Sequence, residues 1–530
     1  MSNAPSLPGD AAVIRSRPTV PACAARKHWV LVAAVLGSTL AYIDESVVNV
    51  ALPKIESDLH TTLAAMQWVV NAYTLSMSAL LLVGGAAADQ FGRRRVYVIG
   101  VSLFALASII SGLAPNVPVL IAARVAQGIG AALLVPCALA LISAAFDETE
   151  RGAAIGIWSG AAAIAGGVAP LLGGLLVDHW SWRAIFLINP LLAIPTLWIA
   201  LIRVPESRDP SASAALDWPG ALLVFAGLGS LVYGLIASSN LGWGAPIVTA
   251  ALSAGLALLA AFVVAERRNA APMMPLELFR SSTFSGVNLL TLLLYGALGA
   301  AFFFLPFLLI QGRGDSATAT GLVYLPFTVV LGVLSRWGGG LVDRFGARGP
   351  LILGPAVTAL GLLLLGVAAG RYTATLFAMV VLGLGMAITV APLTTTVLNA
   401  VPSDRTGVAS GINNAVASVG SLLLIAVLGS VGLWAFNRTL DQELRAANAS
   451  PAVALAVQSA RGGFVIPPMP AGLKEEEQRQ AHALVADALI VTVSRACWIA
   501  AALALASALI AAWTIPRRQR PPESPRRPAS

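Results

Sequence analysis

Charged residues are scarce in this chain, and their scarcity excludes a water-soluble protein. Only 11% of the 530 residues are Asp, Glu, Lys or Arg, whereas 57% are hydrophobic and the mean hydropathy is +0.82. A soluble surface of this size needs far more charge. The composition therefore predicts a protein embedded in lipid, with apolar residues enough for roughly 12 to 15 membrane-spanning helices of ~20 residues each.

Cysteine and histidine are also nearly absent, which excludes the common metal and redox sites. The three cysteines, Cys23, Cys137 and Cys497, have no C-x-x-C spacing, so neither a disulfide framework nor a zinc site is predicted. All four histidines lie outside the long apolar runs, and no Walker-type Gly-Lys-Ser/Thr is present. We predict no metal, no cofactor, no catalytic centre and no ATP-driven transport.

Long apolar runs bounded by charges or by Pro and Gly predict fourteen membrane-spanning helices. They lie at 29–52, 67–87, 96–113, 118–141, 155–176, 185–202, 218–238, 246–265, 284–308, 319–340, 351–370, 374–399, 407–434 and 489–513. Because an ion in hydrocarbon is unfavourable, it is consistent that only five charged residues fall inside these runs: Asp44, Glu45, Arg124, Arg336 and Arg495.

The distribution of Lys and Arg predicts the orientation in the membrane. With the N-terminus inside, the termini and inside loops carry 21 of the 33 basic residues, the short outside loops carry four, the loop near 435–488 carries five and the spans carry three. Basic residues gather on the cytoplasmic side of membrane proteins. Both termini are therefore predicted to be cytoplasmic, and the net charge of +8 requires no nucleic-acid partner.

Two loops that follow predicted helices share one pattern. Residues 85–93 read GAAADQFGR and residues 340–348 read GLVDRFGAR, and the Asp and Gly of the two copies are 254 residues apart. Eight predicted spans separate the copies, so both face the same side of the membrane, as in a parallel internal repeat. Gly permits a sharp turn after a helix, and Asp with Arg provides a charge pair that holds neighbouring helices together.

The first copy, G-x-x-x-D-x-x-G-R, resembles the loop signature of the major facilitator superfamily. Further segments resemble motifs of its fourteen-helix drug:proton antiporters: YIDESVVNVALP at 42–53, RVAQGIG at 124–130, PLLGG at 170–174, WSWR at 180–183 and FLINP at 186–190. Two positions depart from the usual motifs. Ala169 stands where Gly normally precedes Pro170, and Gln90 stands where a basic residue is usual in the first loop.

The resemblance implies an all-α integral membrane protein of the major facilitator fold, built from two six-helix bundles around a central cavity. It also implies export of amphipathic small molecules, such as drugs, driven by inward proton flow. We expect a monomer in the cell membrane. The predicted segments are a cytoplasmic tail at 1–28, a bundle at 29–202, a linker with two inserted helices at 203–283, a bundle at 284–513 with an extracytoplasmic loop at 435–488, and a basic tail at 514–530. The alternatives are transport of one metabolite, such as an amino acid, siderophore or osmolyte, and a non-transporting sensor.

Proton coupling needs a group that changes its protonation state inside the membrane, and the only carboxylates in the predicted spans are Asp44 and Glu45. Adjacent helical residues point ~100° apart, so their roles should differ. Asp44 and Arg124 lie at similar distances, ~13 Å and ~9 Å, from the outer ends of their helices, at 1.5 Å per residue. We predict that this pair couples to protons. The alternative is a static buried ion pair that positions the two helices.

The remaining candidates fall into two groups. Polar side chains in lipid usually face protein, so those within the spans either contact substrate or form interhelical hydrogen bonds: Glu45, Asn71, Tyr73, Asn288, Tyr295 and Asn413. For Glu45 the alternatives to attracting cationic substrates are snorkelling toward the interface and pairing with another helix. The resemblance assigns conformational gating to the two loops and to the fifth helix: Gly85, Asp89, Gly92, Arg93, Asp343, Arg344, Pro170, Gly173 and Gly174.

Overall fold

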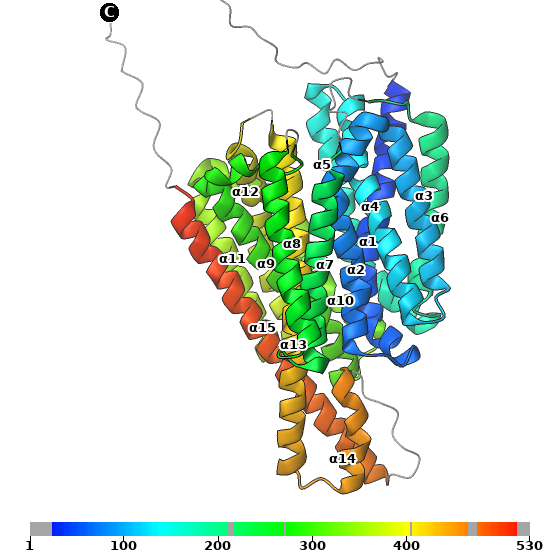
Figure 1. Ribbon diagram of the computed structural model, residues 1–530, viewed down its shortest axis with the longest axis vertical. Helices are drawn as coiled ribbons and strands as arrows, with labels where there is room; N and C mark the ends of the chain where they lie inside the picture. The colour runs from blue at the N-terminus through cyan, green and yellow to red at the C-terminus, as the bar shows by residue number, and fades with distance from the viewer. Residues whose placement is uncertain (1–23, 209–215, 270–271, 403–404, 465–473, 517–530) are drawn as a thin grey trace, which may run out of the picture.

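The described residues form a helical protein in which two bundles stand side by side (Figure 1). The computed structural model describes residues 24–208, 216–269, 272–402, 405–464 and 474–516. Within these ranges fourteen helices are long and apolar enough to cross a membrane, and none of the described residues forms a strand. The fourteen predicted spans are thus all present.

The first bundle consists of six helices: α1 (Ala24–Asp58), α2 (Leu63–Phe91), α3 (Arg93–Gly112), α4 (Val117–Ala145), α5 (Glu148–His179) and α6 (Ala184–Arg203). The sequence marks where several of them begin. Thr62 accepts a hydrogen bond from the Ala65 N–H at the start of α2, and Asn116 accepts one from the Val119 N–H at the start of α4. Such caps satisfy N–H groups that a helix leaves unpaired at its N-terminus.

The second bundle contains α9 (Ser282–Phe307), α10 (Ala317–Phe345), α11 (Arg348–Val367), α12 (Tyr372–Asn399), α13 (Thr406–Ala446) and α15 (Glu475–Thr514). A short helix, η1 (Leu276–Arg280), precedes α9, and a π-helical turn, η2 (Leu308–Gly312), ends it. Between the bundles in sequence are α7 (Trp218–Leu241) and α8 (Pro246–Arg268). Leu228 and Val232 of α7 pack with Leu75 of α2 and Leu422 of α13, so the inserted pair covers the junction of the two bundles.

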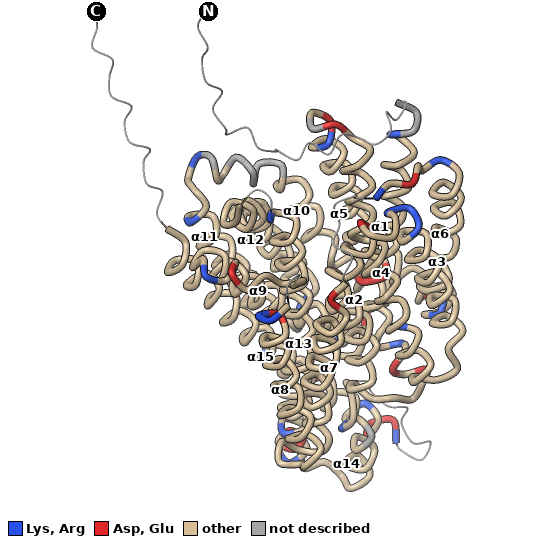
Figure 2. Tube along the Cα trace, turned by 45° about the horizontal axis from the view of Figure 1, so that its top comes forward, with Lys and Arg blue, Asp and Glu red and all other residues tan. Residues whose placement is uncertain are grey.

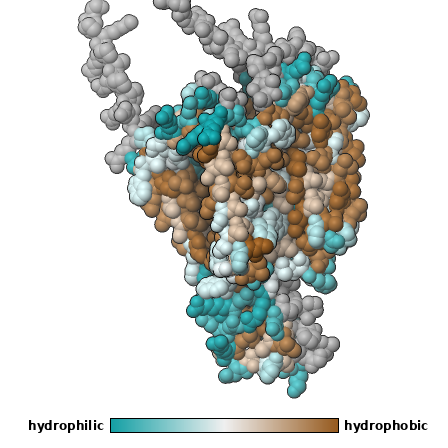
Figure 3. All heavy atoms as spheres, in the orientation of Figure 1, coloured by the Kyte–Doolittle hydropathy of each residue, from teal (hydrophilic) through white to brown (hydrophobic). Residues whose placement is uncertain are grey.

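The outer surface matches a lipid environment over the middle of the bundles. Large apolar side chains are exposed there, including Leu191, Ile194 and Leu256. A broad apolar band crosses the face of the molecule seen in the space-filling view (Figure 3), and many Lys, Arg, Asp and Glu residues lie toward the helix ends (Figure 2). This distribution identifies a multi-pass membrane protein.

The predicted loop at 435–488 is largely helical. Helix α13 continues to Ala446, α14 (Pro451–Gln458) and η4 (Ser459–Gly462) follow, and α15 begins at Glu475. Together they form a hairpin that projects from one end of the bundles, away from the beginning of α1 and the end of α15 (Figure 1). Hydropathy cannot detect these extensions because they are polar, yet a helix in water satisfies its own backbone hydrogen bonds just as well.

Phe464 anchors the hairpin to both bundles. Its ring packs against Phe304, Phe307 and Phe436, with ring centroids 5.4 to 6.0 Å apart. Its backbone N–H donates to the carboxylate of Glu56, which is buried near the end of α1. The hairpin base therefore joins the second bundle to the first at this end of the molecule, which we call the hairpin end.

We expect the hairpin to lie outside the cell and the turn between α2 and α3 to lie inside. In a variant without the native cysteines, Leu455→Cys on the hairpin should react with a membrane-impermeant maleimide on intact cells, because Leu455 is 69% exposed. Phe91→Cys, 55% exposed at the opposite end, should react only after permeabilisation. The reverse pattern would show that the predicted orientation is wrong.

Candidate functional site

A buried carboxylate lies at the centre of the first bundle. Asp44 is inaccessible to solvent, and its carboxylate accepts hydrogen bonds from three side chains on two other helices. Arg124 of α4 donates through Nη1 and forms an ion pair. Gln127 Nε2, also on α4, and Asn189 Nδ2 on α6 each lie 3.0 Å from Asp44 Oδ1. All three groups donate, so the carboxylate acts as the acceptor in every one of these bonds.

Arg124 has partners of its own besides Asp44. Its Nε donates to the Val69 carbonyl oxygen at 3.1 Å, and its guanidinium lies 4.4 Å from the centre of the Tyr73 ring. The Tyr73 hydroxyl donates to the Ala41 carbonyl oxygen, so the ring is fixed in place. These contacts hold the cation even when its interaction with Asp44 weakens.

Small residues on α4 bring the helices close enough for this network. A Cβ on Gly128 would lie 2.8 Å from Ser76 Cβ of α2, and one on Gly130 would lie 2.8 Å from the Phe104 backbone nitrogen of α3. Such distances leave no room for a side chain. Close approach through small residues is how helices associate in lipid, where the hydrophobic effect between them is weak.

The sequence predicts that Asp44 and Arg124 lie near one another, and the structure places them in contact. Gln127 and Asn189 were not predicted from the sequence as members of the site. The signals were present. Gln127 follows Arg124 by three residues and so shares its helix face, and Asn189 is a lone amide in a strongly apolar run. Two hydroxyls extend the network: Ser111 donates to Gln127 Oε1 at 3.0 Å, and Ser108 accepts from Asn189 Nδ2 at 2.9 Å.

Glu45, the neighbour of Asp44, points elsewhere. Its side chain is exposed, and no other residue of α1 from Ala33 to Pro53 is. Helix α1 packs against α2, α4, α5 and α6 and also contacts α9 and α10 of the other bundle, so it lies between the two bundles. We interpret the exposure of Glu45 as exposure to space between the bundles, which agrees with different roles for the two carboxylates.

The two bundles are in close contact toward the hairpin end. Gly174 of α5 packs against the Ala317 backbone of α10, and Gly321 of α10 packs against the Pro170 backbone. The Asp178 carboxylate accepts from the N–H groups of Ala317 and Thr318, at 3.1 and 2.7 Å, which caps the N-terminus of α10 from the other bundle. A carboxylate is favourable there because the helix dipole places positive charge at that end.

A second contact between the bundles joins α2 and α13. Gln67 Nε2 donates to the Ile425 carbonyl oxygen at 2.7 Å, and the amide rests on Gly429. At the opposite end α5 and α10 diverge: a Cβ on Gly152, Gly160 or Gly332 would meet no atom within 4 Å. The bundles are thus in close contact through α5 and α10 at the hairpin end and lose that contact toward the other end, which we call the open end, although Gly411 of α13 still packs against Leu82 of α2.

Of the predicted gating residues, Pro170, Gly173 and Gly174 lie in the closed part of α5, where Gly173 packs against Val47 of α1. The loop residues lie at the open end. Arg93 donates to Asp89 at 2.7 and 2.9 Å, which joins α2 to α3. Gly85 faces Pro136 of α4.

The glycines of the repeat share a conformation. Gly92 and Gly346 have φ angles of +109° and +71°, a region that favours glycine, and each ends a helix. The sequence prediction missed Glu206, which accepts from the Arg94 N–H at 3.0 Å and lies beside Gly92. In the second copy Arg344 is exposed, and the side chain of Asp343 lies outside the described residues.

The predicted substrate contacts are mostly buried in this conformation. Tyr73 lies beneath Arg124. Asn413 Nδ2 donates to Asn288 Oδ1 at 3.2 Å and to Thr291 Oγ1 at 2.9 Å, so these amides join α9 to α13. Tyr295 is half-buried, and Asn71 is buried with no hydrogen-bond partner for either end of its amide among the described residues.

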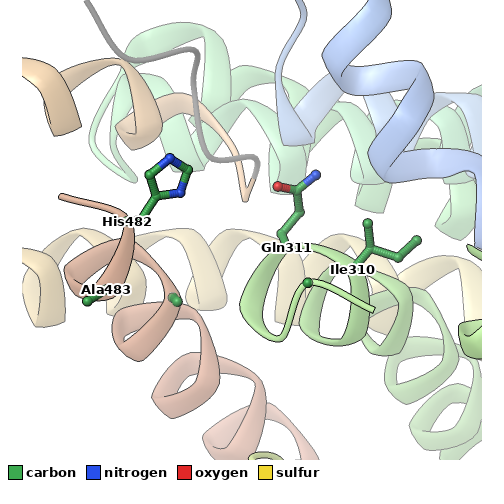
Figure 4. Close-up of a pocket in the computed structure, with 6 residues that line it drawn as sticks. Ile310, Gln311, His482 and Ala483 are labelled. Carbon is green, nitrogen blue, oxygen red and sulfur yellow. The ribbon is translucent and has the colours of Figure 1, made fainter. Parts of the chain in front are cut away.

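A surface pocket of about 480 Å³ lies at the hairpin end, between η2 and the start of α15 (Figure 4). His482, Gln311, Ile310 and Ala483 line it. None of the Asp44 network contributes to this pocket, and its lining carries no carboxylate. It is separate from the candidate site.

The chain matches the family model of the Major Facilitator Superfamily over residues 34–223 and 218–425, and it belongs to that superfamily. It is 40% identical to the multidrug resistance protein Stp of Mycobacterium tuberculosis over 424 residues, 79% of each chain. It is 32% identical to the tetracenomycin C resistance and export protein of Streptomyces glaucescens over 500 residues, 93% of this chain and 92% of that one.

Solved structures share the fold. One is a bacterial homolog of the human lysosomal transporter Spinster in an inward-facing, occupied conformation, with a TM-score of 0.64, 17% identity and coverage of 93% of this chain and 98% of that chain. Another is the POT family transporter PepTSo, with a TM-score of 0.63, 15% identity and the same coverage. At these identities the likeness concerns the fold alone.

The closed contact between α5 and α10 predicts that Gly174→Val will open the hairpin end. Overpacking there is unfavourable by about 1–3 kcal/mol, which shifts a closed-to-open equilibrium roughly tenfold or more. A cysteine at Ala317, which is buried at this contact, should then react roughly tenfold faster with a water-soluble maleimide. Gly160→Val, the same change in the open part of α5, should leave that rate unchanged. Equal rates in both variants would contradict this description of the closed end.

Proposed function

We propose that the protein exports amphipathic small molecules, drugs or antibiotics among them, in exchange for protons. One observation carries the proposal. Asp44 is a buried, hydrogen-bonded carboxylate, and the adjacent Glu45 is an exposed carboxylate that we place at the space between the bundles. An ionisable residue buried in a membrane helix is by default a candidate functional site, as in ion pathways and proton relays. The relatives named for multidrug resistance and for antibiotic export support the same assignment.

The geometry suggests how the exchange proceeds. With the open end facing the cytoplasm, Asp44 is charged and paired with Arg124, and substrate enters the space that Glu45 borders. The loaded protein then opens at the hairpin end, where a proton arriving from outside neutralises Asp44, weakens its attraction for Arg124 and loosens α1 from α4. Substrate leaves outward, the hairpin end closes, and the proton passes to the cytoplasm. The proton and the substrate then use alternate conformations of one site.

Glu45 sets the charge preference of the transported compound in this proposal. A carboxylate in a space bounded by apolar helices attracts cations strongly, because the surroundings screen charge less than water does. Helix α5, which packs against α1, is rich in Ala and Gly, which suits lipophilic bodies of varied shape. Lipophilic amines are therefore the favoured substrate class. We further propose that the protein works as a monomer with both termini in the cytoplasm.

Transport into inverted membrane vesicles tests the proposal. With an imposed proton gradient, wild type should accumulate a lipophilic cationic dye, and Asp44→Asn should abolish accumulation because its amide cannot cycle a proton. Glu45→Gln should reduce uptake of the cation roughly tenfold, as expected for loss of an attraction of about 1.4 kcal/mol, while a neutral dye is unaffected.

Glu476→Gln is the matched control, since Glu476 is a carboxylate with 88% exposure on the hairpin. Its transport should equal that of wild type, and collapse of the gradient should stop accumulation in every variant. Unchanged transport in Asp44→Asn would refute the proton role. No dye transport by wild type under an intact gradient would favour a narrow metabolite transporter instead.

A further inference from the structure

The three partners of Asp44 differ in what they can do when the carboxyl group gains a proton. A protonated carboxyl becomes a hydrogen-bond donor and needs an acceptor. Arg124 has only donors, so it cannot provide one. Gln127 has a carbonyl oxygen, but that oxygen already accepts from Arg124 Nη1 at 3.1 Å and from Ser111 Oγ at 3.0 Å. Both groups are therefore fixed as donors toward Asp44.

Asn189 is different. Its Nδ2 donates to Asp44 and to Ser108, whereas its Oδ1 is buried and has no hydrogen-bond partner among the described residues. A buried unpaired carbonyl is unfavourable and unusual, so this oxygen calls for an explanation. We infer that Asn189 is a positioning residue whose side-chain amide rotates by half a turn when Asp44 is protonated. Its Oδ1 then accepts a hydrogen bond from the protonated carboxyl group. This inference rests on the proton-coupled function proposed above.

Each orientation of the amide leaves one end unpaired. Toward the charged carboxylate, the NH₂ group is used and the carbonyl is unpaired; toward the neutral acid, the carbonyl is used and the NH₂ group loses its bond to Asp44. Neither orientation is fully satisfied, so the protonation state of Asp44 decides between them. A fully satisfied amide, like that of Gln127, would resist turning.

Other ionisable groups near Asp44 do not substitute for Asn189. Arg124 faces it from α4, Tyr73 lies beneath Arg124 on α2, and Tyr42 and Glu45 are its neighbours on α1. Among the described side chains, the remaining helices against α1 carry their charges toward their ends: Glu150 to Arg151 and Asp178 to His179 on α5, Arg203 on α6 and Arg344 on α10. The other ionisable groups there are Tyr324 on α10, which donates to the Phe302 carbonyl oxygen, and Tyr295 on α9. The acceptor for the proton on Asp44 must therefore be a neutral group beside it.

The turning of Asn189 would also carry the signal to α3 and α6. Ser108 of α3 accepts from Asn189 and donates to the Phe186 carbonyl oxygen of α6 at 2.8 Å. When the amide turns, Ser108 loses its donor, and its hydroxyl is free to donate to Asn189 instead of to Phe186. A change of charge on α1 thus alters the contact between α3 and α6, one turn from the site.

Infrared difference spectroscopy of the purified protein in nanodiscs tests the inference without transport. The carbonyl stretch of protonated Asp44 is identified by its absence in Asp44→Asn, and its growth is followed as pH falls. Asn189→Leu removes both a donor to the charged form and an acceptor for the neutral form. Because hydrogen bonds to charged groups are the stronger, we expect the midpoint to rise by about one pH unit. We also expect the band to move to higher frequency, because the acid has lost its acceptor.

Thr196→Val is the matched control, since Thr196 is a buried polar residue of α6 that bonds only its own helix, at Leu192. Its midpoint and band should equal those of wild type. In Asn189→Ser, whose hydroxyl both donates and accepts, the midpoint and the band frequency should lie between those of wild type and Asn189→Leu. If Asn189→Leu does not fold, Asn189→Ser takes its place in the comparison.

The outcomes separate the two proposals. If wild type shows an Asp44 band and Asn189→Leu leaves its frequency unchanged, Asn189 does not accept the proton and the inference is wrong, while the proton site stands. If wild type shows no titrating Asp44 band at all, both the inference and the proposed proton coupling are wrong.

Discussion

The burial of the Asp44 carboxylate within a helix bundle in lipid is the constraint on which the other features depend. An ion there is unfavourable by several kcal/mol unless it is paired and hydrogen-bonded. Arg124, Gln127 and Asn189 supply those bonds, and they do so only if α1, α4 and α6 lie at matching depths. The glycines of α4, the ring of Tyr73 and the hydroxyls of Ser108 and Ser111 follow from that requirement, because each either lets a helix approach or orients one of the donors.

The contacts between the bundles are of a different kind, and the difference is functional. Inside the first bundle they are a dense set of charged hydrogen bonds. Between the bundles they include close backbone packing at Gly174 and Gly321, a helix cap from Asp178, an amide from Gln67 and the bond from the Phe464 N–H to Glu56. Such contacts are individually modest, so the proposed mechanism needs only a small change in free energy at Asp44 to open them. A transporter that alternates between two conformations needs a rigid binding site and contacts between its bundles that break easily.

Much of the fold could be predicted from sequence, because the physics involved is local. Apolar length gave all fourteen spans, and the repeated loops placed Gly92 and Gly346 at equivalent turns. The depth of Asp44 and Arg124 along their helices placed them near one another. What could not be predicted depends on helix rotation. The sequence does not say which face α6 turns inward, so it does not single out Asn189. It also leaves open whether Tyr73, Asn288 and Asn413 contact substrate or neighbouring helices, and in this conformation they contact neighbouring helices. The polar extensions of α13 and α15 were missed because hydropathy reports lipid contact, not helix formation.

The central claim is that protonation of Asp44 changes which end of the molecule is open, and a distance measurement tests it most directly. Spin labels at Trp180 and Arg371 report on the hairpin end, and labels at Ala153 and Phe345 on the opposite end; all four residues are exposed, two in each bundle. As pH falls, the distance at the hairpin end should lengthen and the other should shorten. Asp44→Asn, which imitates the neutral acid, should give the low-pH distances at every pH. If the distances do not respond to pH in wild type, or if they still respond in Asp44→Asn, Asp44 does not govern the transition.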